Sequence, residues 1–242
     1  METKPLSPPR LVSAALILII AALVFLSPLA QSADSPQSVE LSRTDRPWEF
    51  LAAVGTRAGL FGNEAGRFEA WVYPLKILRD FHLRFHVDGR VIPAETLART
   101  VTVRPESSAI LYTGDTFAVR ETFFVPVREP GAVIILEVET AEPLEVEVVF
   151  ERDFQLEWPA ALGGTYGNWD SKLSAFYLGE EQKKFSAFVG SPTAVEVQQE
   201  YDTNYSSSEE NSFHLGVTSK GKETKIVVIA ASTNGRAEAE ST

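Results

Sequence analysis

The sequence predicts an all-β fold, a large antiparallel β-sandwich behind an N-terminal export segment. From Trp48 onward hydrophobic residues recur mainly at alternate positions, and turn-forming pairs such as Asp88-Gly89 separate these runs at intervals of about 8–12 residues. No stretch of this part has the pattern of a long helix. The chain has 242 residues, of which 44% are apolar, and no cysteine, so we expect one core that is packed without disulfides.

The N-terminal segment predicts an extracytoplasmic location, periplasmic or secreted. Lys4 and Arg10 precede an uncharged run rich in Leu, Ile and Ala, and small residues after Pro28 offer a signal peptidase site. The uncharged stretch also reaches the roughly 20 residues that a membrane span requires. The alternative is therefore an uncleaved anchor over residues 11–30.

Changes in composition along the chain predict the boundaries of its segments. A polar stretch with little apolar content follows the export segment and is expected to be a flexible linker. We expect a signal peptide or anchor at 1–32, the linker at 33–46, the sandwich domain at 47–232, and a tail or the start of another linker at 233–242.

Strands are predicted where apolar and polar residues alternate. The clearest runs are Arg67–Tyr73, Ile77–Val87 and Leu144–Phe150. In the second of these the alternation places Leu78 on the polar face. Asn168–Leu178 is expected to be one further strand, and the short run Gly59-Leu-Phe-Gly62 is expected to be a turn.

A set of aromatic and polar residues is the candidate carbohydrate site. Sugars stack their C–H faces on flat rings while acids and amides hold their hydroxyl groups, a lining typical of small-molecule sites. The alternative is that these rings fill the core or cover sheet edges. The candidates are Trp71, Tyr73, Trp158, Tyr166, Trp169 and Asp170.

We predict no catalytic residue, cofactor or metal ion. Motifs of nucleophilic, nucleotide-binding and zinc-protease sites are missing from the sequence. Acids on strands are explained by a solvated face, although glycoside hydrolysis would use a pair of them. His82 and His86 share a face, but their spacing is too long for adjacent ligands on one strand, and Arg84 between them would repel a cation. His214 is isolated in the sequence.

The stretch from Gly59 to Lys76, followed by Leu83 to Gly89, resembles the N-terminal β-sandwich of bacterial glycogen-debranching and glucoamylase-type proteins, which are six-hairpin glycosidases. The resemblance covers roughly Trp48 to Ala231. It implies a galactose-mutarotase-like supersandwich that packs against an (α/α)6 catalytic barrel. No such barrel is present in this chain, so no catalytic residue is carried over. The resemblance also implies that Trp71, Tyr73 and the loop from Trp158 to Trp169 face the rim of the sugar site.

Three functions follow from these observations. The first is a non-catalytic sandwich module of an exported glycoside hydrolase that acts on α-glucans, with the catalytic barrel or a neighbouring glycosidase subunit as its partner. The second is a free-standing carbohydrate-binding protein. The third is a mutarotase-like enzyme, although we expect no turnover from the chain alone. Nucleic acid is not an expected partner, because the net charge is −11 and the bases are scattered.

Overall fold

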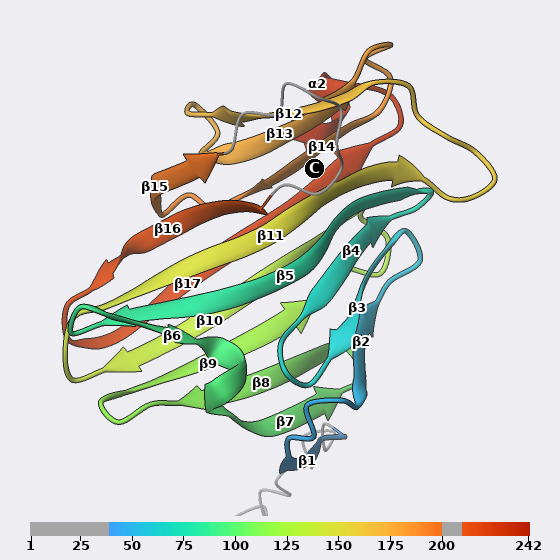
Figure 1. The fold of residues 1–242 in the computed structure, drawn as a ribbon. Helices are drawn as coiled ribbons and strands as arrows, with labels where there is room; N and C mark the ends of the chain where they lie inside the picture. Colours follow the sequence, from blue (N-terminus) through green and yellow to red (C-terminus); the bar gives the residue numbers. More distant parts are fainter. Residues whose placement is uncertain (1–38, 200–209) are drawn as a thin grey trace, which may run out of the picture. The chain divides into compact units, whose positions relative to one another are not determined.

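The computed structural model describes residues 39–199 and 210–242, and this part consists of two large antiparallel sheets. Figure 1 shows the two sheets as separate layers. The nine-stranded sheet has the order β1-β7-β8-β9-β10-β17-β14-β13-β12. The eight-stranded sheet has the order β15-β16-β11-β5-β4-β3-β2, with β6 also paired to β5. The predicted all-β sandwich is therefore confirmed.

The strands have the following bounds. The nine-stranded sheet contains β1 (Leu41–Thr44), β7 (Ala98–Arg104), β8 (Ser107–Thr113), β9 (Phe117–Phe124), β10 (Gly131–Thr140), β12 (Thr165–Asp170), β13 (Ala175–Glu180), β14 (Ser186–Gly190) and β17 (Gly221–Ser232). The eight-stranded sheet contains β2 (Phe50–Val54), β3 (Ala58–Asn63), β4 (Phe68–Val72), β5 (Leu75–Val87), β6 (Arg90–Pro93), β11 (Leu144–Leu156), β15 (Ala194–Gln199) and β16 (Glu210–Thr218). Two short helices, the 3-10 helix η1 (Ala94–Leu97) and the α-helix α2 (Arg236–Glu240), complete the described part.

The core lies between the two sheets and is built by alternate residues of each strand. In β10, for example, Ile134, Leu136 and Val138 are buried while Glu137 and Glu139 between them are exposed. The Phe85 ring from the eight-stranded sheet packs edge-on against Tyr112, with ring centroids 5.6 Å apart. Interdigitated rings of this kind fix the spacing of the layers and leave the outer faces for other contacts.

One irregularity in β5 changes which residues reach the outer face. Asp80 has a φ of +50°, and the pairing of β5 with β4 shifts register here. An extra residue in one strand reverses the alternation on either side of it. Leu78 and Phe81 therefore both point into the core, and the prediction that Leu78 lies on the polar face was wrong. His82, Arg84 and His86 follow the bulge and share the outer face as predicted.

Other elements also differ from the expectations. Ala58–Asn63 is a strand and not a turn, since it pairs with both β2 and β4, and Gly59 and Gly62 lie against the rings of Phe61 and Phe68. The single strand expected over Asn168–Leu178 is a hairpin of β12 and β13. In the stretch expected to be a linker, β1 pairs with β7.

The stretch expected to be a C-terminal tail contains α2. Its Ala239 is buried, and its Arg236 forms an ion pair with Asp170. The structured domain thus includes both β1 and α2. Among residues 39–199 and 210–242, no helix is long and apolar enough to cross a membrane. The predicted export segment at 1–32 and the alternative anchor at 11–30 lie outside the described residues.

Candidate functional site

The outer face of the eight-stranded sheet, called the polar face below, is lined by paired charges. Lys76 Nζ lies 2.7 Å from Glu69 and 2.9 Å from Asp153. Arg79 lies 2.7 Å from Glu151 across the β5–β11 pair. Opposite charges on neighbouring strands stabilise a sheet and hold side chains in fixed positions. The polar face is therefore ordered by its own side chains.

A shallow hollow of about 510 Å³ opens on the polar face over β2 to β5. Its lining combines aromatic rings, an amide and both signs of charge. The lining side chains include those of Phe50, Phe61, Asn63, Arg67, Glu69, Arg79 and Asp80. Rings beside fixed polar groups are typical of sites that bind small polar ligands.

Three of the predicted sugar-binding residues lie at this end of the sheet. Trp71 donates a hydrogen bond from Nε1 to Glu69 (2.8 Å), a carboxylate that also lines the hollow. Tyr73 continues the same face and is partly exposed. The loop carrying Trp158 is attached beside it, because the Glu157 amide donates to the Pro74 carbonyl (2.9 Å). Trp158 is 88% exposed.

The aromatic end of the polar face can now be defined by Phe50, Phe61, Trp71 and Tyr73. The Phe50 and Phe61 rings stack with centroids 6.5 Å apart. A Cβ on Gly59 would lie 2.6 Å from the Phe61 ring and 3.0 Å from the Tyr73 hydroxyl, so the bare glycine lets both side chains lie close to the backbone. Sequence reasoning missed Phe50 and Phe61, because β2 and β3 were not recognised as strands.

The other three predicted residues lie on β12, away from the aromatic end and on different faces of that strand. Trp169 packs into the core against Phe176, with ring centroids 5.1 Å apart. Tyr166 stacks edge-on with Tyr177, and Asp170 pairs with Arg236 of α2. Successive side chains of a strand point to opposite faces, so the compact motif from Tyr166 to Asp170 does not form one binding surface.

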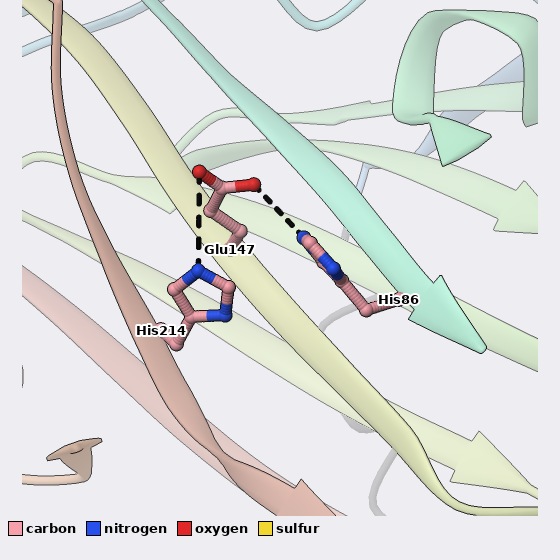
Figure 2. Close-up of side chains that lie close together, drawn as sticks. All are labelled: His86, Glu147 and His214. Atoms are coloured by element: carbon pink, nitrogen blue, oxygen red, sulfur yellow. Dashed lines mark hydrogen bonds and ion pairs between the residues drawn. The ribbon is translucent and has the colours of Figure 1, made fainter. Parts of the chain in front are cut away.

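A second group of residues, called the histidine cluster below, consists of His86, Glu147 and His214 on three neighbouring strands (Figure 2). The His86 Nε2 atom lies 2.9 Å from Glu147 Oε2. The His214 Nε2 atom lies 4.0 Å from the other carboxylate oxygen, Oε1. The ring centroids of the two histidines are 4.8 Å apart.

The pairing register of the sheet explains this convergence. Glu147 on β11 is directly opposite His214 on β16, and Glu145 is directly opposite His86 on β5. His86 is therefore the diagonal neighbour of Glu147 on the same face, within reach of a long side chain. The three cluster residues are far apart in the sequence but meet in the folded chain. The interpretation of His214 as isolated was therefore wrong.

Glu147 is only 5% exposed, yet its surroundings stabilise the negative charge of its carboxylate. Burial alone raises the pKa of a carboxyl group. Hydrogen bonds from His86 and Ser212 and the charges of Arg84 and His214 outweigh this effect and hold the pKa of Glu147 below its ordinary value. The expectation that acids on this strand lie on a freely solvated face does not apply to Glu147.

His82 belongs to a different environment from His86. Its Nδ1 atom lies 2.7 Å from the Asp80 carbonyl oxygen and 3.4 Å from the Arg67 guanidinium. Arg67 in turn pairs with Asp80 and Glu95. The two histidines of β5 therefore do not approach one ligand, although they share a face.

The comparisons with known proteins support the fold. No family model matches the chain, and no curated protein matches it in sequence. Among solved structures, the chain is similar to a bacterial glucoamylase determined in complex with acarbose, with a TM-score of 0.55 and 9% sequence identity. The match covers 84% of this chain and 35% of the glucoamylase, so the chain spans about a third of that enzyme.

Two other structures have lower scores. A putative aldose 1-epimerase from Escherichia coli K12 matches with a TM-score of 0.44 and 10% identity, over 76% of this chain and 98% of its own. A putative kojibiose phosphorylase from the human microbiome matches with a TM-score of 0.39 and 8% identity, over 82% of this chain and 26% of its own. The fold comparison therefore depends on the glucoamylase, and it shows that the chain has the two-sheet sandwich found in part of that enzyme.

Proposed function

We propose that this chain is a non-catalytic, carbohydrate-binding β-sandwich module of an exported glucoamylase-type glycoside hydrolase, and that it contacts an α-glucan through the aromatic end of the polar face. The observation that carries the proposal is the hollow in which Phe50 and Phe61 lie beside Asn63 and paired charges. Stacked rings supply apolar contact area, and the fixed acid, amide and guanidinium groups supply hydrogen bonds to hydroxyl groups.

Two further observations support this function. The glucoamylase whose fold the chain shares was crystallised with acarbose and is about three times as long as the matched segment. Trp158 is almost fully exposed on the loop that joins β11 to β12, where a partner domain or a glycan can cover it. Large exposed rings are common at interaction surfaces. The partner in this proposal is an (α/α)6 catalytic barrel.

An independent enzyme of the mutarotase type is less well supported by the site. Such an enzyme needs a general base whose pKa lies near the working pH. The carboxylate next to histidines, Glu147, has a lowered pKa and is already surrounded by donors from His86, Ser212 and Arg84. These contacts weaken it as a base.

The proposal is tested by titrating the purified chain with maltoheptaose in a calorimeter. We expect binding that Phe61→Ala and Trp71→Ala each weaken by at least about tenfold, equivalent to roughly 1.4 kcal/mol per variant. Tyr166→Ala, which removes a similar ring from β12, is the matched control and should bind as the unaltered chain does. Equal binding by all three variants, or no binding by the folded chain, would contradict the proposal.

A further inference from the structure

The histidine cluster places three ligands of two types, imidazole and carboxylate, as in a transition-metal site, although the sequence predicted no metal. We propose that His86, Glu147 and His214 bind one divalent transition-metal ion of the Zn²⁺ type. Their candidate ligand atoms all lie within 4.8 Å of one another. Zn²⁺ is held by imidazole nitrogen and carboxylate oxygen at about 2.0–2.2 Å, so the side chains need to close in by only a small movement.

The sheet supplies the rigidity that such a site needs. Each ligand comes from a residue within a paired strand, β5, β11 or β16, and the register fixes Glu147 between the two histidines. Sites built on strands hold their ligands more precisely than sites on loops. Figure 2 shows the two imidazoles facing different oxygens of the Glu147 carboxylate, so one ion placed among the three side chains can contact all of them.

The surrounding charges also favour a cation. With neutral imidazoles, Glu145, Glu147 and Glu210 oppose Arg84 alone, which leaves the neighbourhood with excess negative charge. Arg84 was expected to repel a cation. Its Nη2 atom instead bonds Glu210 at 3.0 Å, whereas Nη1 lies 3.5 Å from Glu147. The guanidinium thus donates its hydrogen bond to Glu210, while Glu147 Oε1 lies 3.5 Å from Arg84 Nη1 and 4.0 Å from His214 Nε2, so a bound ion shares this oxygen with Arg84.

Glu145 is placed to orient His214. Metal-binding histidines usually donate their second ring N–H to a carboxylate, which fixes the tautomer and the ring plane. His214 Nδ1 is buried and has no hydrogen bond to any described residue in its present orientation, but Glu145 Oε2 lies only 3.2 Å away. When Nε2 takes up the ion, Nδ1 must carry the proton, and Glu145 is the acceptor within reach.

The exposure of the two histidines also suits metal binding. The side chains of His86 and His214 are 27% and 14% exposed, so the cluster is open enough to admit an ion and to leave a position for water. A three-ligand site with an open position is the arrangement that catalytic zinc sites share.

The test uses the full chain, carrying no histidine tag and first treated with EDTA and desalted. Zn²⁺ and Co²⁺ are titrated in a calorimeter, and the visible absorption of bound Co²⁺ reports coordination by nitrogen. We expect one ion per chain and a higher melting temperature with Zn²⁺, because a ligand that binds only the folded state stabilises it. Mg²⁺ and Ca²⁺, which prefer oxygen ligands, should have no effect.

Variants separate the cluster from adventitious binding. His86→Ala and His214→Ala should each weaken Zn²⁺ binding by more than about 100-fold, and Glu145→Gln by about 10-fold or more. His82→Ala and Glu151→Gln, on the same strands but outside the cluster, are the matched controls and should bind normally. Thermal unfolding of each variant without metal shows that it folds. Absence of Zn²⁺ binding by the unaltered chain, or binding that survives in both cluster histidine variants, would overturn the proposal. Glycan binding at the aromatic end is measured separately and does not affect this outcome.

Discussion

Two of the buried carboxylates of this sandwich, Glu121 and Glu147, respond to burial in opposite ways. Glu121 on β9 points into the core between the sheets and is 0% exposed, while Glu147 on β11 lies on the polar face and is 5% exposed. Burial raises the pKa of Glu121 to about 8, although a hydrogen bond from Tyr112 pulls it down. The pKa of Glu147 lies below its ordinary value.

The difference lies in the number of donors that each carboxylate meets. Glu121 receives one hydrogen bond, from the Tyr112 hydroxyl at 2.6 Å, and its Oε1 atom has no partner among the described residues. Glu147 receives hydrogen bonds from His86 and Ser212 and has Arg84 and His214 nearby. Desolvation disfavours charge at both sites, so the donors decide which carboxyl group stays ionised. Glu147 therefore stays ionised on the polar face, whereas Glu121 stays protonated in the core near neutral pH.

The largest expected effect comes from Glu121→Gln. Folding raises the pKa of Glu121 from 4.5 to about 8, so the stabilisation by its bound proton is fully present below pH 4.5 and is lost as the pH rises through about 8. Each pKa unit corresponds to about 1.36 kcal/mol, so this loss is on the order of 5 kcal/mol. The Gln side chain stays neutral at every pH. The free energy of unfolding of the variant, relative to that of the unaltered chain, should therefore rise by this amount between pH 4.5 and pH 8.5.

Urea unfolding of both proteins across this pH range measures the effect. The free energy of unfolding of the variant minus that of the unaltered chain should rise with pH. Glu142→Gln, which replaces a carboxylate exposed after β10, is the control for general effects of lost charge. A difference that stays constant with pH would show that Glu121 is ionised in the core.

Glu147→Gln should have the opposite sign at neutral pH. Removing the carboxylate charge leaves Arg84 and the histidines without their shared partner, and because these partners are partly exposed the expected loss is about 1.5–3 kcal/mol. Urea unfolding at pH 7 in the presence of EDTA measures this loss without any contribution from metal. If Glu147→Gln were as stable as the unaltered chain, the hydrogen bonds and ion pairs of Glu147 would not stabilise the polar face.

The sequence predicts the core well and the sites poorly, for a physical reason. Alternation along a strand reports which face is buried, so the sandwich and most of its strands can be deduced from short stretches such as Leu144–Phe150. A single bulge at Asp80 is enough to reverse this pattern, and the alternation of the local sequence does not mark its position.

Convergence between strands cannot be deduced in the same way. His86, Glu147 and His214 meet because of the pairing register of three strands that are separated by more than 60 residues. Conversely, Tyr166 and Trp169 are close in sequence but lie on opposite faces of β12. Trp71 on β4 and Tyr73, the residue directly after this strand, are the predicted pair that the fold keeps together. Proximity in the sequence predicts a shared surface only at even spacing along a strand.

The smallest expected effect comes from the Arg79–Glu151 pair, which lies on the polar face outside the histidine cluster. Its Nε and Oε2 atoms are only 2.7 Å apart, but the two side chains are 43% and 31% exposed. Solvent screens such pairs, and double-mutant cycles on them typically give about 0.2–1 kcal/mol. We expect a coupling in this range from Arg79→Ala, Glu151→Gln and the double variant, and we expect it to fall further in 1 M salt. A coupling above about 2 kcal/mol would mean that distance alone determines the strength of charge pairs on this sheet. Exposed and desolvated pairs would then contribute equally at equal distance.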